Sequence, residues 1–436
     1  MRPHSRQLPA GAGAGEGRRP QCLPPCSARP DYLTQRENAM QIKSLAIENF
    51  KSLSNSGVVR MKPLTVLIGN NGSGKSSLLE AVETYRQVVL EGVDAAMEHW
   101  QGFEHIRHKA AASRLTTAAR VDPTRQHGAM SFRLKLAMPV GPVDLSLKVN
   151  VREAGNRLYI QEERFRVGKG PELTREGVAH PQALAEDRSA MFGVPALAET
   201  AEALRELIFL RLNPDVIGNL QPLRRSGGRM RLSGDGANVA EYLIDLRERS
   251  PSAFDTVAQA IRFVLPYALD VEPKIMDAGL LRRGYVQLPE DRYEIPGWLM
   301  SSGSLRVLPL VATLLDPDPP TLVFIEELEN GLDPRTVGLV IDLMRDATRS
   351  GRTQVIATTH SPYLLDMLDL DDVLLCERGP GGPEFTWPAS RNDMEPWRTR
   401  FLPGRLYTMN ALQRLVTHPA VEQEAEAPEG GWGEDE

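Results

Sequence analysis

The stretch Leu64–Ser76, LTVLIGNNGSGKS, decides the fold. Its opening run, Leu64–Ile68, is apolar and β-branched and stops at a glycine, as a buried parallel strand does. The run after it, Gly69–Ser76, fits the pattern GxxxxGK[ST]. Helical spacing then continues from Ser76 to about Leu90. Strand, loop and helix therefore follow one another in the order that a phosphate-binding loop requires.

Each residue type in this loop has a chemical task. Glycines let backbone N–H groups turn toward phosphate oxygens, and the helix that follows adds partial positive charge at its N-terminus. We expect Lys75 to reach the β- and γ-phosphates and the Ser76 hydroxyl to bind magnesium. The predicted ATP contacts in this part of the chain are Gly69, Asn70, Asn71, Gly72, Ser73, Gly74, Lys75, Ser76 and Ser77.

A second apolar strand, Leu322–Ile325, ends in two carboxylates, Glu326 and Glu327. At the carboxyl edge of a parallel sheet, the first acid can hold the magnesium shell and the second can polarise a water for attack on the γ-phosphate. Acids after a strand are by themselves more often a solvated loop or a helix cap. Together with the phosphate loop, they favour a site that hydrolyses ATP.

Composition limits the class of protein. With 436 residues the chain can form two or three packed units. The formal net charge of -6 opposes general nucleic-acid binding, although a local basic strip could still contact phosphates. The cysteines Cys22, Cys26 and Cys376 are too few for a disulfide framework and lack zinc-site partners, which fits a reducing cytoplasm. No apolar run is long enough to cross a bilayer, so no membrane partner is expected.

The chain divides into five predicted segments. Residues 1–39 are rich in Gly, Pro and Arg and are expected to be disordered, so that either Met1 or Met40 is the functional start. Residues 40–170 are expected to form the first ATPase lobe, with an antiparallel sheet built from alternating patterns at 130–136, 143–149 and 158–160. Residues 419–436 are expected to be a disordered acidic tail.

The two segments between them complete the prediction. Residues 171–299 carry helical spacing and are expected to be a helical lobe insertion, with helices at Ala198–Leu212, Ala237–Arg249 and Ala253–Val264. Residues 300–418 are expected to complete the ATPase core, with parallel strands at Thr321–Ile325, Thr353–Ala357 and Asp372–Leu375 and a crossover helix at Arg335–Ala347.

Four motifs in chain order now carry a specific resemblance. They are GNNGSGKSS (69–77), MSSGSLR (300–306), FIEELENGLDP (324–334) and ATTHSPYLLD (357–366). This order resembles the RecF/OLD/SMC-like branch of ABC-type ATPases, and in particular the compact stand-alone bacterial proteins predicted to be AAA-family ATPases. The likeness extends over roughly residues 40–415 and includes IKSLAIENFKSL (42–53) and SGDGANVAEYLIDL (233–246).

The resemblance implies an α/β fold, that of a P-loop NTPase of the ABC/SMC head type, with a mixed sheet, an antiparallel β subdomain and a helical lobe insertion. It implies ATP and Mg²⁺ as cofactors and a homodimer that sandwiches ATP. Glu326 matches the Walker B acid and Glu327 the catalytic glutamate. The remaining matches are Ser301 and Gly303 to the signature motif, Asp333 to the D-loop and His360 to the catalytic switch histidine.

Some residues depart from the family pattern or match it only loosely. The signature lacks the transporter form LSGGQ and Glu326 replaces the usual aspartate, which argues against a transporter subunit; the longer side chain can still reach magnesium through water. Lys51 is a candidate nucleotide contact, and Gln161, after the predicted strand at 158–160, is a candidate for the glutamine that couples the lobes. Three histidines are read as surface residues: His99, His105 and His108.

Two classes of function remain open. In the first, a DNA-repair, DNA-maintenance or phage-defence ATPase closes on duplex DNA, with Arg224, Arg225, Arg229 and Arg231 as a candidate contact strip. In the second, an ATP-driven switch controls a separately encoded effector protein, such as a toxin or nuclease. Because about 75 residues follow His360, we expect no appended nuclease domain. A small-molecule kinase would share only the phosphate loop and is disfavoured.

Overall fold

The computed structural model describes residues 40–109, 128–152, 157–176, 187–223, 229–279, 281–379 and 381–412. The disorder expected for 1–39 and 419–436, and the cysteines Cys22 and Cys26, lie outside these residues. Every structural statement below concerns the described part of the chain.

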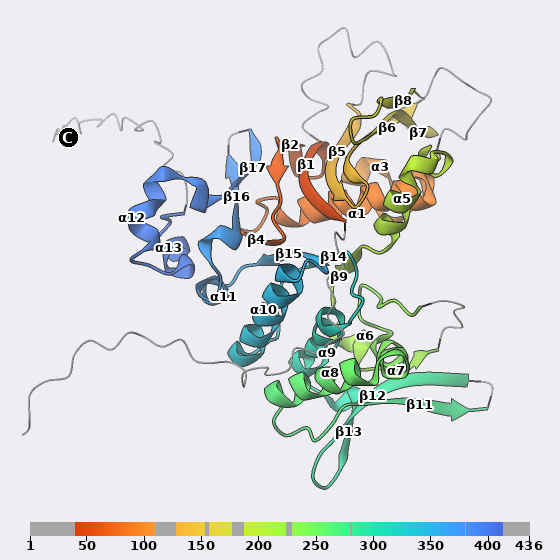
Figure 1. The fold of residues 1–436 in the computed structure, drawn as a ribbon, viewed down its shortest axis with the longest axis vertical. Helices are drawn as coiled ribbons and strands as arrows, with labels where there is room; N and C mark the ends of the chain where they lie inside the picture. Colours follow the sequence, from red (N-terminus) through yellow and green to blue (C-terminus); the bar gives the residue numbers. More distant parts are fainter. Residues whose placement is uncertain are drawn as a thin grey trace, which may run out of the picture. The chain divides into compact units, whose positions relative to one another are not determined.

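A six-stranded sheet forms the centre of the core (Figure 1). Its order is β17-β16-β4-β15-β14-β9, and every neighbouring pair from β16 to β9 is parallel, whereas β17 is antiparallel to β16. The strands are β4 (Leu64–Ile68), β9 (Ile208–Leu210), β14 (Leu322–Ile325), β15 (Gln354–Thr359), β16 (Val373–Gly379) and β17 (Gly382–Thr386). All residues of β4, β9, β14 and β15 are buried, which explains why these strands are mostly apolar and do not alternate with exposed polar residues.

A seven-stranded antiparallel sheet forms a second layer, in which β3 pairs with β1 outside the order β2-β1-β5-β6-β7-β8. Its strands are β1 (Gln41–Phe50), β2 (Leu53–Asn55), β3 (Val59–Arg60), β5 (Met130–Met138), β6 (Gly141–Arg152), β7 (Arg157–Val167) and β8 (Leu173–Glu176). Burial alternates along much of β5, because its apolar residues face the core. The three alternating segments predicted from sequence are therefore confirmed as β5, β6 and β7.

The helix α1 (Lys75–Glu91) shares one hydrophobic cluster with both sheets. Tyr85 of α1 lies 6.5 Å, ring centroid to ring centroid, from Phe132 of β5, and Phe132 lies 5.7 Å from Phe50 of β1. The same cluster includes residues of α2 (Val93–His99), α3 (Phe103–Ile106) and α5 (Ala198–Arg205). The start of α1, and with it the phosphate loop, is thus fixed by a large apolar core.

The predicted helical insertion contains helices and also a sheet. Within the predicted bounds, 171–299, α5 is followed by α6 (Pro214–Ile217), α7 (Val239–Arg249) and α8 (Pro251–Val264). These last three contact α9 (Ser302–Leu315), which lies beyond the predicted insertion in the segment 300–418. The sheet of the insertion has the order β10-β12-β11, with β13 also paired to β12; the strands are β10 (Gln221–Pro222), β11 (Glu272–Ala278), β12 (Leu281–Pro289) and β13 (Glu294–Pro296). We call these elements the signature lobe, because α9 begins at the signature motif.

The helix expected over Ala198–Leu212 was wrong in its second half. It ends at Arg205, and Ile208–Leu210 instead form β9 at the edge of the core sheet. Phe209 of β9 stacks on Phe324 of β14, with ring centroids 4.4 Å apart and ring planes within 2°. This contact joins residues far apart in sequence, so local spacing could not indicate it.

The remaining elements follow the expected order. The helix α10 (Pro334–Arg349) connects β14 to β15, as predicted, and the last helices are α11 (Pro362–Asp366), α12 (Glu395–Arg398) and α13 (Pro403–Thr408). Short 3₁₀ turns occur at Met191–Gly193, Pro195–Leu197, Gly297–Leu299, Leu370–Asp372, Pro388–Ser390 and Asn392–Met394.

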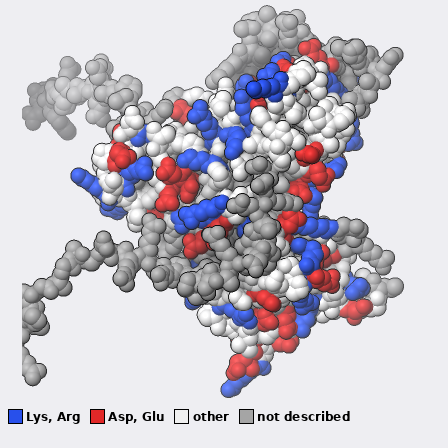
Figure 2. Space-filling view, in the orientation of Figure 1, with Lys and Arg blue, Asp and Glu red and all other residues white. Residues whose placement is uncertain are grey.

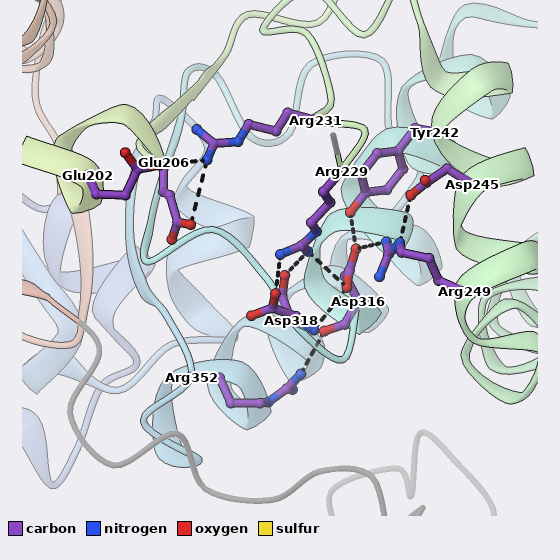
Figure 3. Close-up of polar contacts among 10 residues, drawn as sticks. All are labelled: Glu202, Glu206, Arg229, Arg231, Tyr242, Asp245, Arg249, Asp316, Asp318 and Arg352. Atoms are coloured by element: carbon purple, nitrogen blue, oxygen red, sulfur yellow. Dashed lines mark hydrogen bonds and ion pairs between the residues drawn. The ribbon is translucent and has the colours of Figure 1, made fainter. Parts of the chain in front are cut away.

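A buried ion cluster joins the signature lobe to the core (Figure 3). Asp316, directly after α9, is fully buried and accepts hydrogen bonds from Tyr242 and from Arg249 Nη2, the latter at 2.9 Å. Arg229 Nη2 lies 3.3 Å from its Oδ1 atom. Arg352, just before β15, donates to the Asp316 carbonyl oxygen at 3.0 Å. Burial, and then the charge of Asp316, raise the pKa of Tyr242 well above its ordinary value, so its hydroxyl stays a donor.

We expect Asp316→Ala to destabilise the protein by about 3–5 kcal/mol, because it leaves two arginines and a buried tyrosine without their shared acceptor. Urea unfolding measures this loss. Asp318→Ala is the matched control: that side chain is 39% exposed and also pairs with Arg229, so we expect a loss of less than about 1 kcal/mol. Equal losses in the two variants would contradict the role given to Asp316.

Candidate nucleotide-binding site

The phosphate loop, Gly69–Gly74, connects the end of β4 to the start of α1, as predicted. Gly72 and Gly74 have backbone φ angles of 75° and 105°, in the region that favours glycine. A Cβ atom at Gly69 would lie 2.0 Å from the Cys376 carbonyl oxygen, and one at Gly74 would lie 2.8 Å from Pro383. The β16–β17 hairpin therefore packs directly on the loop and requires glycine at both positions.

The side chain of Lys75 folds back over this loop. It is 5% exposed, and its Nζ atom donates to the carbonyl oxygens of Gly69 at 2.7 Å and Asn70 at 3.1 Å. Burial lowers the pKa of Lys75, while the nearby carboxylates of Glu327 and Glu329 oppose that shift. The lysine is thus a cation held by backbone carbonyls at the place where a phosphate-binding lysine is needed.

Three serines of the loop region differ in their contacts. The Ser73 hydroxyl is buried and has no hydrogen-bond partner in the described part of the chain, so it is an unused donor beside Lys75. Ser77 accepts a hydrogen bond from the Ser52 hydroxyl at 2.9 Å. Ser76 is exposed at the first turn of α1. The exposed Ser76 at this helix start therefore suits an anion and its magnesium ion.

Glu326 stands directly after β14, and a basic residue holds it. The Glu326 Oε1 atom accepts a hydrogen bond from Arg211 Nε at 2.8 Å, and Arg211 Nη1 lies 2.7 Å from Glu83 Oε2. Burial raises the pKa of Glu326, whereas the charge of Arg211 opposes that shift. Our sequence analysis missed Arg211; an arginine directly after the apolar run Ile208–Leu210 was the available signal.

Glu327 lies in an unusual backbone conformation with φ of 49°. Its N–H donates to Thr358 Oγ1 at 2.9 Å, and its exposed carboxylate accepts from Asn330 Nδ2 at 3.2 Å. A non-glycine residue in this region costs about 1–3 kcal/mol and is enriched at functional sites. The turn directs two successive glutamates differently: Glu326 toward Arg211 and Glu327 toward solvent.

His360 follows β15 and is exposed, so its ring is free to meet a ligand. Its backbone N–H donates to Glu329 Oε1 at 2.6 Å, and Glu329 Oε2 is buried without a hydrogen-bond partner among the described residues. The histidine is therefore tied to the loop that follows Glu326 and Glu327. Through this hydrogen bond, the residue that follows β15 is connected to the loop that follows β14.

The predicted signature and D-loop residues cap helices within the chain. Ser301 accepts from the Ser304 N–H at 3.2 Å, and the Oγ atoms of the two serines lie 2.8 Å apart. Asp333 accepts from the N–H groups of Arg335 at 2.9 Å and Thr336 at 3.2 Å. Although burial favours the protonated form of Asp333, hydrogen bonds from Thr336 and Arg335 lower its pKa overall. Their contacts to ATP across a dimer remain predictions.

The signature turn packs on the loop that follows the paired glutamates. A Cβ atom at Gly303 would lie 2.3 Å from the Gly331 carbonyl oxygen, far inside contact distance. The glycine of the signature is therefore required by its own chain, whatever it contacts in an assembly.

Two other candidates lie elsewhere or have other partners. Lys51 Nζ contacts Glu80 Oε2 at 2.8 Å and lies 3.7 Å from the centre of the Trp100 ring. Gln161 was predicted to follow a strand, but β7 continues to Val167 and Gln161 lies within it, accepting from Asn150 Nδ2 at 2.9 Å. A role of Gln161 in coupling the lobes stays a prediction.

The three histidines near residue 100 have ordinary contacts. His99 and His105 are exposed, as expected, and His99 packs edge-on against the Trp100 ring, with centroids 4.9 Å apart. His108 is half-buried, and its Nδ1 atom lies 2.7 Å from the Lys51 carbonyl oxygen.

The basic strip predicted at 224–231 is only partly described, because Arg224 and Arg225 lie outside the described residues. Arg229 pairs with Asp316 and Asp318, and Arg231 lies 3.5 Å from Glu202 Oε1 and 3.6 Å from Glu206 Oε1 (Figure 3). On the face in Figure 2, basic and acidic side chains are interspersed over the described surface. Arg229 and Arg231 are therefore already neutralised by acids of the chain.

Comparison with family models agrees with this geometry. Residues 161–366, which include both glutamates and His360, match the family described as "AAA domain, putative AbiEii toxin, Type IV TA system". Residues 40–87, which include the phosphate loop, match the family described as "AAA ATPase domain". Both matching models describe AAA domains, and together they include the phosphate loop, the paired glutamates and His360. The strand order and the loop between β4 and α1 confirm the mixed α/β P-loop architecture expected from the sequence.

Individual relatives are distant. A 73-residue stretch is 34% identical to ABC transporter G family member 35 of Arabidopsis thaliana; it covers 17% of this chain and only 5% of that protein.

Similar solved structures are SMC heads. The SMC head bound to the C-winged helix domain of ScpA is 14% identical, with 79% of this chain and 96% of that chain covered and a TM-score of 0.47. The Pyrococcus furiosus Smc head bound to the C-terminal domain of ScpA is 13% identical, with coverages of 80% and 96% and a TM-score of 0.49. The Thermotoga maritima SMC head is 14% identical, with coverages of 79% and 98% and a TM-score of 0.41.

Two features of the described residues concern membranes and metals. None of the described helices combines the length and apolar character needed to span a bilayer. The described residues also contain no group of three or more His, Cys, Asp or Glu arranged to hold a metal ion. Magnesium in nucleotide sites commonly takes one or two protein ligands, with phosphates and waters completing its shell, so Ser76 and Glu326 fit that donor set.

We expect Gly303→Ala to destabilise the protein by about 1–3 kcal/mol, because the new methyl group forces the signature turn away from Gly331. Gly338→Ala is the matched control: its Cβ meets nothing within 4 Å, and alanine in α10 should stabilise by up to about 1 kcal/mol. Urea unfolding of both variants measures the difference. Equal stabilities would show that the contact is easily relieved.

Proposed function

We propose that this chain hydrolyses ATP to ADP and phosphate with Mg²⁺ and that its ATP cycle opens and closes a homodimer. The observation that carries the proposal is the common sheet edge at which β4, β14 and β15 end in the phosphate loop, the paired glutamates and His360. The carboxyl edge of such a sheet is where α/β proteins bind nucleotides.

The phosphate end of ATP has donors of three kinds. In this proposal, backbone N–H groups of Gly69–Gly74 and of the start of α1 bind phosphate oxygens, although the Ser73 N–H donates to the Asn70 carbonyl oxygen at 3.2 Å in this structure. The Ser73 hydroxyl, which has no partner among the described residues, adds a donor. Lys75 exchanges the carbonyl oxygens of Gly69 and Asn70 for phosphate oxygens. Ser76 and Glu326 would hold magnesium, which neutralises charge on the phosphates when it is bound.

Glu327 and His360 act on the γ-phosphate in this proposal. Glu327 accepts a proton from the water whose oxygen attacks the γ-phosphorus, and the bond from that phosphorus to the bridging oxygen breaks. His360 contacts the γ-phosphate and, through Glu329, is joined to the loop that carries Glu327. In this proposal, the residue that activates water and the residue that contacts the γ-phosphate are therefore connected by hydrogen bonding through Glu329.

The dimer proposal assigns Ser301 and Asp333 to the ATP held by a second copy. Ser301 begins α9, so its hydroxyl and the free N–H groups of that helix form a donor set for an anion. ATP would then bridge two copies, and hydrolysis would remove the bridging γ-phosphate.

Two roles were expected for the ATP cycle: a DNA-maintenance or phage-defence ATPase that clamps duplex DNA, and a switch that controls a separate effector protein. The described charges favour the switch. Arg229 and Arg231 are paired with acids of the chain, and so they offer little net charge to phosphates. The description of the longer matching family refers to a toxin–antitoxin system, which is compatible with control of a separate effector protein.

We expect Lys75→Ala to abolish ATP binding and Glu327→Gln to bind ATP while hydrolysing it at least about 100-fold more slowly. Steady-state hydrolysis by the full chain, together with ATP binding, checks both. Hydrolysis by Glu327→Gln at the wild-type rate would refute the catalytic assignment.

The same hydrolysis assay with duplex DNA at two salt concentrations distinguishes the two classes of function. A DNA clamp requires stimulation of hydrolysis that weakens as salt rises, and a partner switch does not.

A second prediction concerns assembly. We expect Glu327→Gln saturated with ATP to be a dimer, because ATP is retained between the heads, and we expect Ser301→Arg to stay monomeric while still binding ATP. Analytical ultracentrifugation with and without ATP measures both. A monomeric Glu327→Gln protein at saturating ATP would contradict the sandwich.

A further inference from the structure

The register of β9 and β14 places Arg211 beside Glu326, the candidate magnesium ligand. In the β9–β14 pair, Leu210 lies opposite Ile325, so the next residues, Arg211 and Glu326, leave the sheet side by side. Parallel neighbours end at the same edge, and the guanidinium therefore lies beside the carboxylate that is expected to serve magnesium.

The guanidinium bridges two acids in a largely enclosed setting. Its Nε atom donates to Glu326 Oε1 at 2.8 Å, and its Nη1 atom contacts Glu83 Oε2 of α1 at 2.7 Å. The exposed fractions of the side chains are 34% for Arg211, 20% for Glu326 and 11% for Glu83. Arg211 Nη2 is buried and has no hydrogen-bond partner among the described residues. The arginine is therefore held against the site by two acids, although its side chain stays partly exposed.

Electrostatics explain why a cation is needed at this place. Burial raises the pKa of Glu326, and the charges of Glu80 and Glu83 raise it further, whereas Arg211 lowers it. Glu80 has its own partner, Lys51. Arg211 is therefore the basic side chain that holds Glu326 in this structure. A carboxylate that is hydrogen-bonded to a guanidinium has to release it, at least in part, to serve magnesium.

We propose that Arg211 is an internal counter-cation for Glu326 and that it competes with magnesium for this carboxylate. The inference rests on the proposed magnesium–ATP function. In the nucleotide-free protein Arg211 holds Glu326; when magnesium and ATP bind, the guanidinium gives up Glu326 and keeps its contact with Glu83. Arg211 is a positioning residue, because it acts on the site through Glu326 and Glu83.

The test compares nucleotide affinity with and without metal. The Kd of the full chain for the fluorescent analogue mant-ATP is measured in excess Mg²⁺ and in EDTA, and the ratio of the EDTA value to the Mg²⁺ value gives the metal enhancement. We expect Arg211→Gln to raise this ratio by about threefold to tenfold, the effect of losing one partly exposed ion pair. General weakening of the fold would change both Kd values together and leave the ratio unaltered.

Arg205→Gln is the matched control. Arg205 pairs with Glu202 at 2.8 Å and is 49% exposed, so we expect its removal to leave the ratio within twofold of wild type. If Arg211→Gln does not fold, Glu83→Gln provides the second variant. It leaves Arg211 to Glu326 alone, and we expect the ratio to fall by about threefold.

The outcomes distinguish a failure of the proposed magnesium–nucleotide function from a failure of the proposed competition between Arg211 and magnesium. A wild-type ratio of one, with no effect of metal on mant-ATP binding, would reject the proposed magnesium–nucleotide function itself. A wild-type ratio above one that is unchanged in Arg211→Gln would overturn the competition inference and leave the proposed function standing. If only Glu83→Gln can be measured, an unchanged or increased ratio would overturn it.

Discussion

In-register pairing of four parallel strands is the constraint on which the candidate site depends. Ile68 pairs with Thr359, while Ala357 and Leu210 both pair with Ile325. The residues that follow these strands therefore emerge at one edge: the phosphate loop, His360, Glu326 and Arg211. Because all four strands are buried on both faces, their register is fixed by packing, and a slip of one residue would exchange the side chains packed on the two faces and misplace the site.

Charged side chains at one sheet edge lose hydration when they are buried. The described residues offset this loss in a different way at each strand end. Lys75 is buried, but two backbone carbonyls hold it. Glu326 is half-buried, and Arg211 offsets its charge. Glu327 is turned into solvent by a left-handed backbone conformation, so its carboxylate needs no buried cation. The charged groups at this edge are thus held by backbone carbonyls, by one arginine or by solvent. A bound nucleotide has to displace these partners.

The sequence was sufficient where the signal was local. The phosphate loop, the paired glutamates and the antiparallel strands could be predicted because strand period, loop composition and motif order lie within short stretches. It was insufficient where long-range contacts decide the structure. The short strand at Ile208–Leu210 has no pattern of its own, and only pairing with β14 makes it a strand, so Arg211 was missed. The acids that neutralise Arg229 lie about ninety residues later in the chain, so the basic strip could be read as free charge.

The close contact between Gly303 and Gly331 links the two halves of the proposed mechanism. In the sandwich, Ser301 serves the ATP of a second copy, whereas Glu327 serves the ATP of its own chain. The Gly331 carbonyl leaves no room for a Cβ atom at Gly303, so the start of α9 cannot shift toward this loop. A rearrangement of the loop between Glu327 and Asp333 on loss of the γ-phosphate would therefore displace Ser301 as well. Opening of one site and release of the other would then be mechanically the same event, because packed backbone segments move together rather than compress.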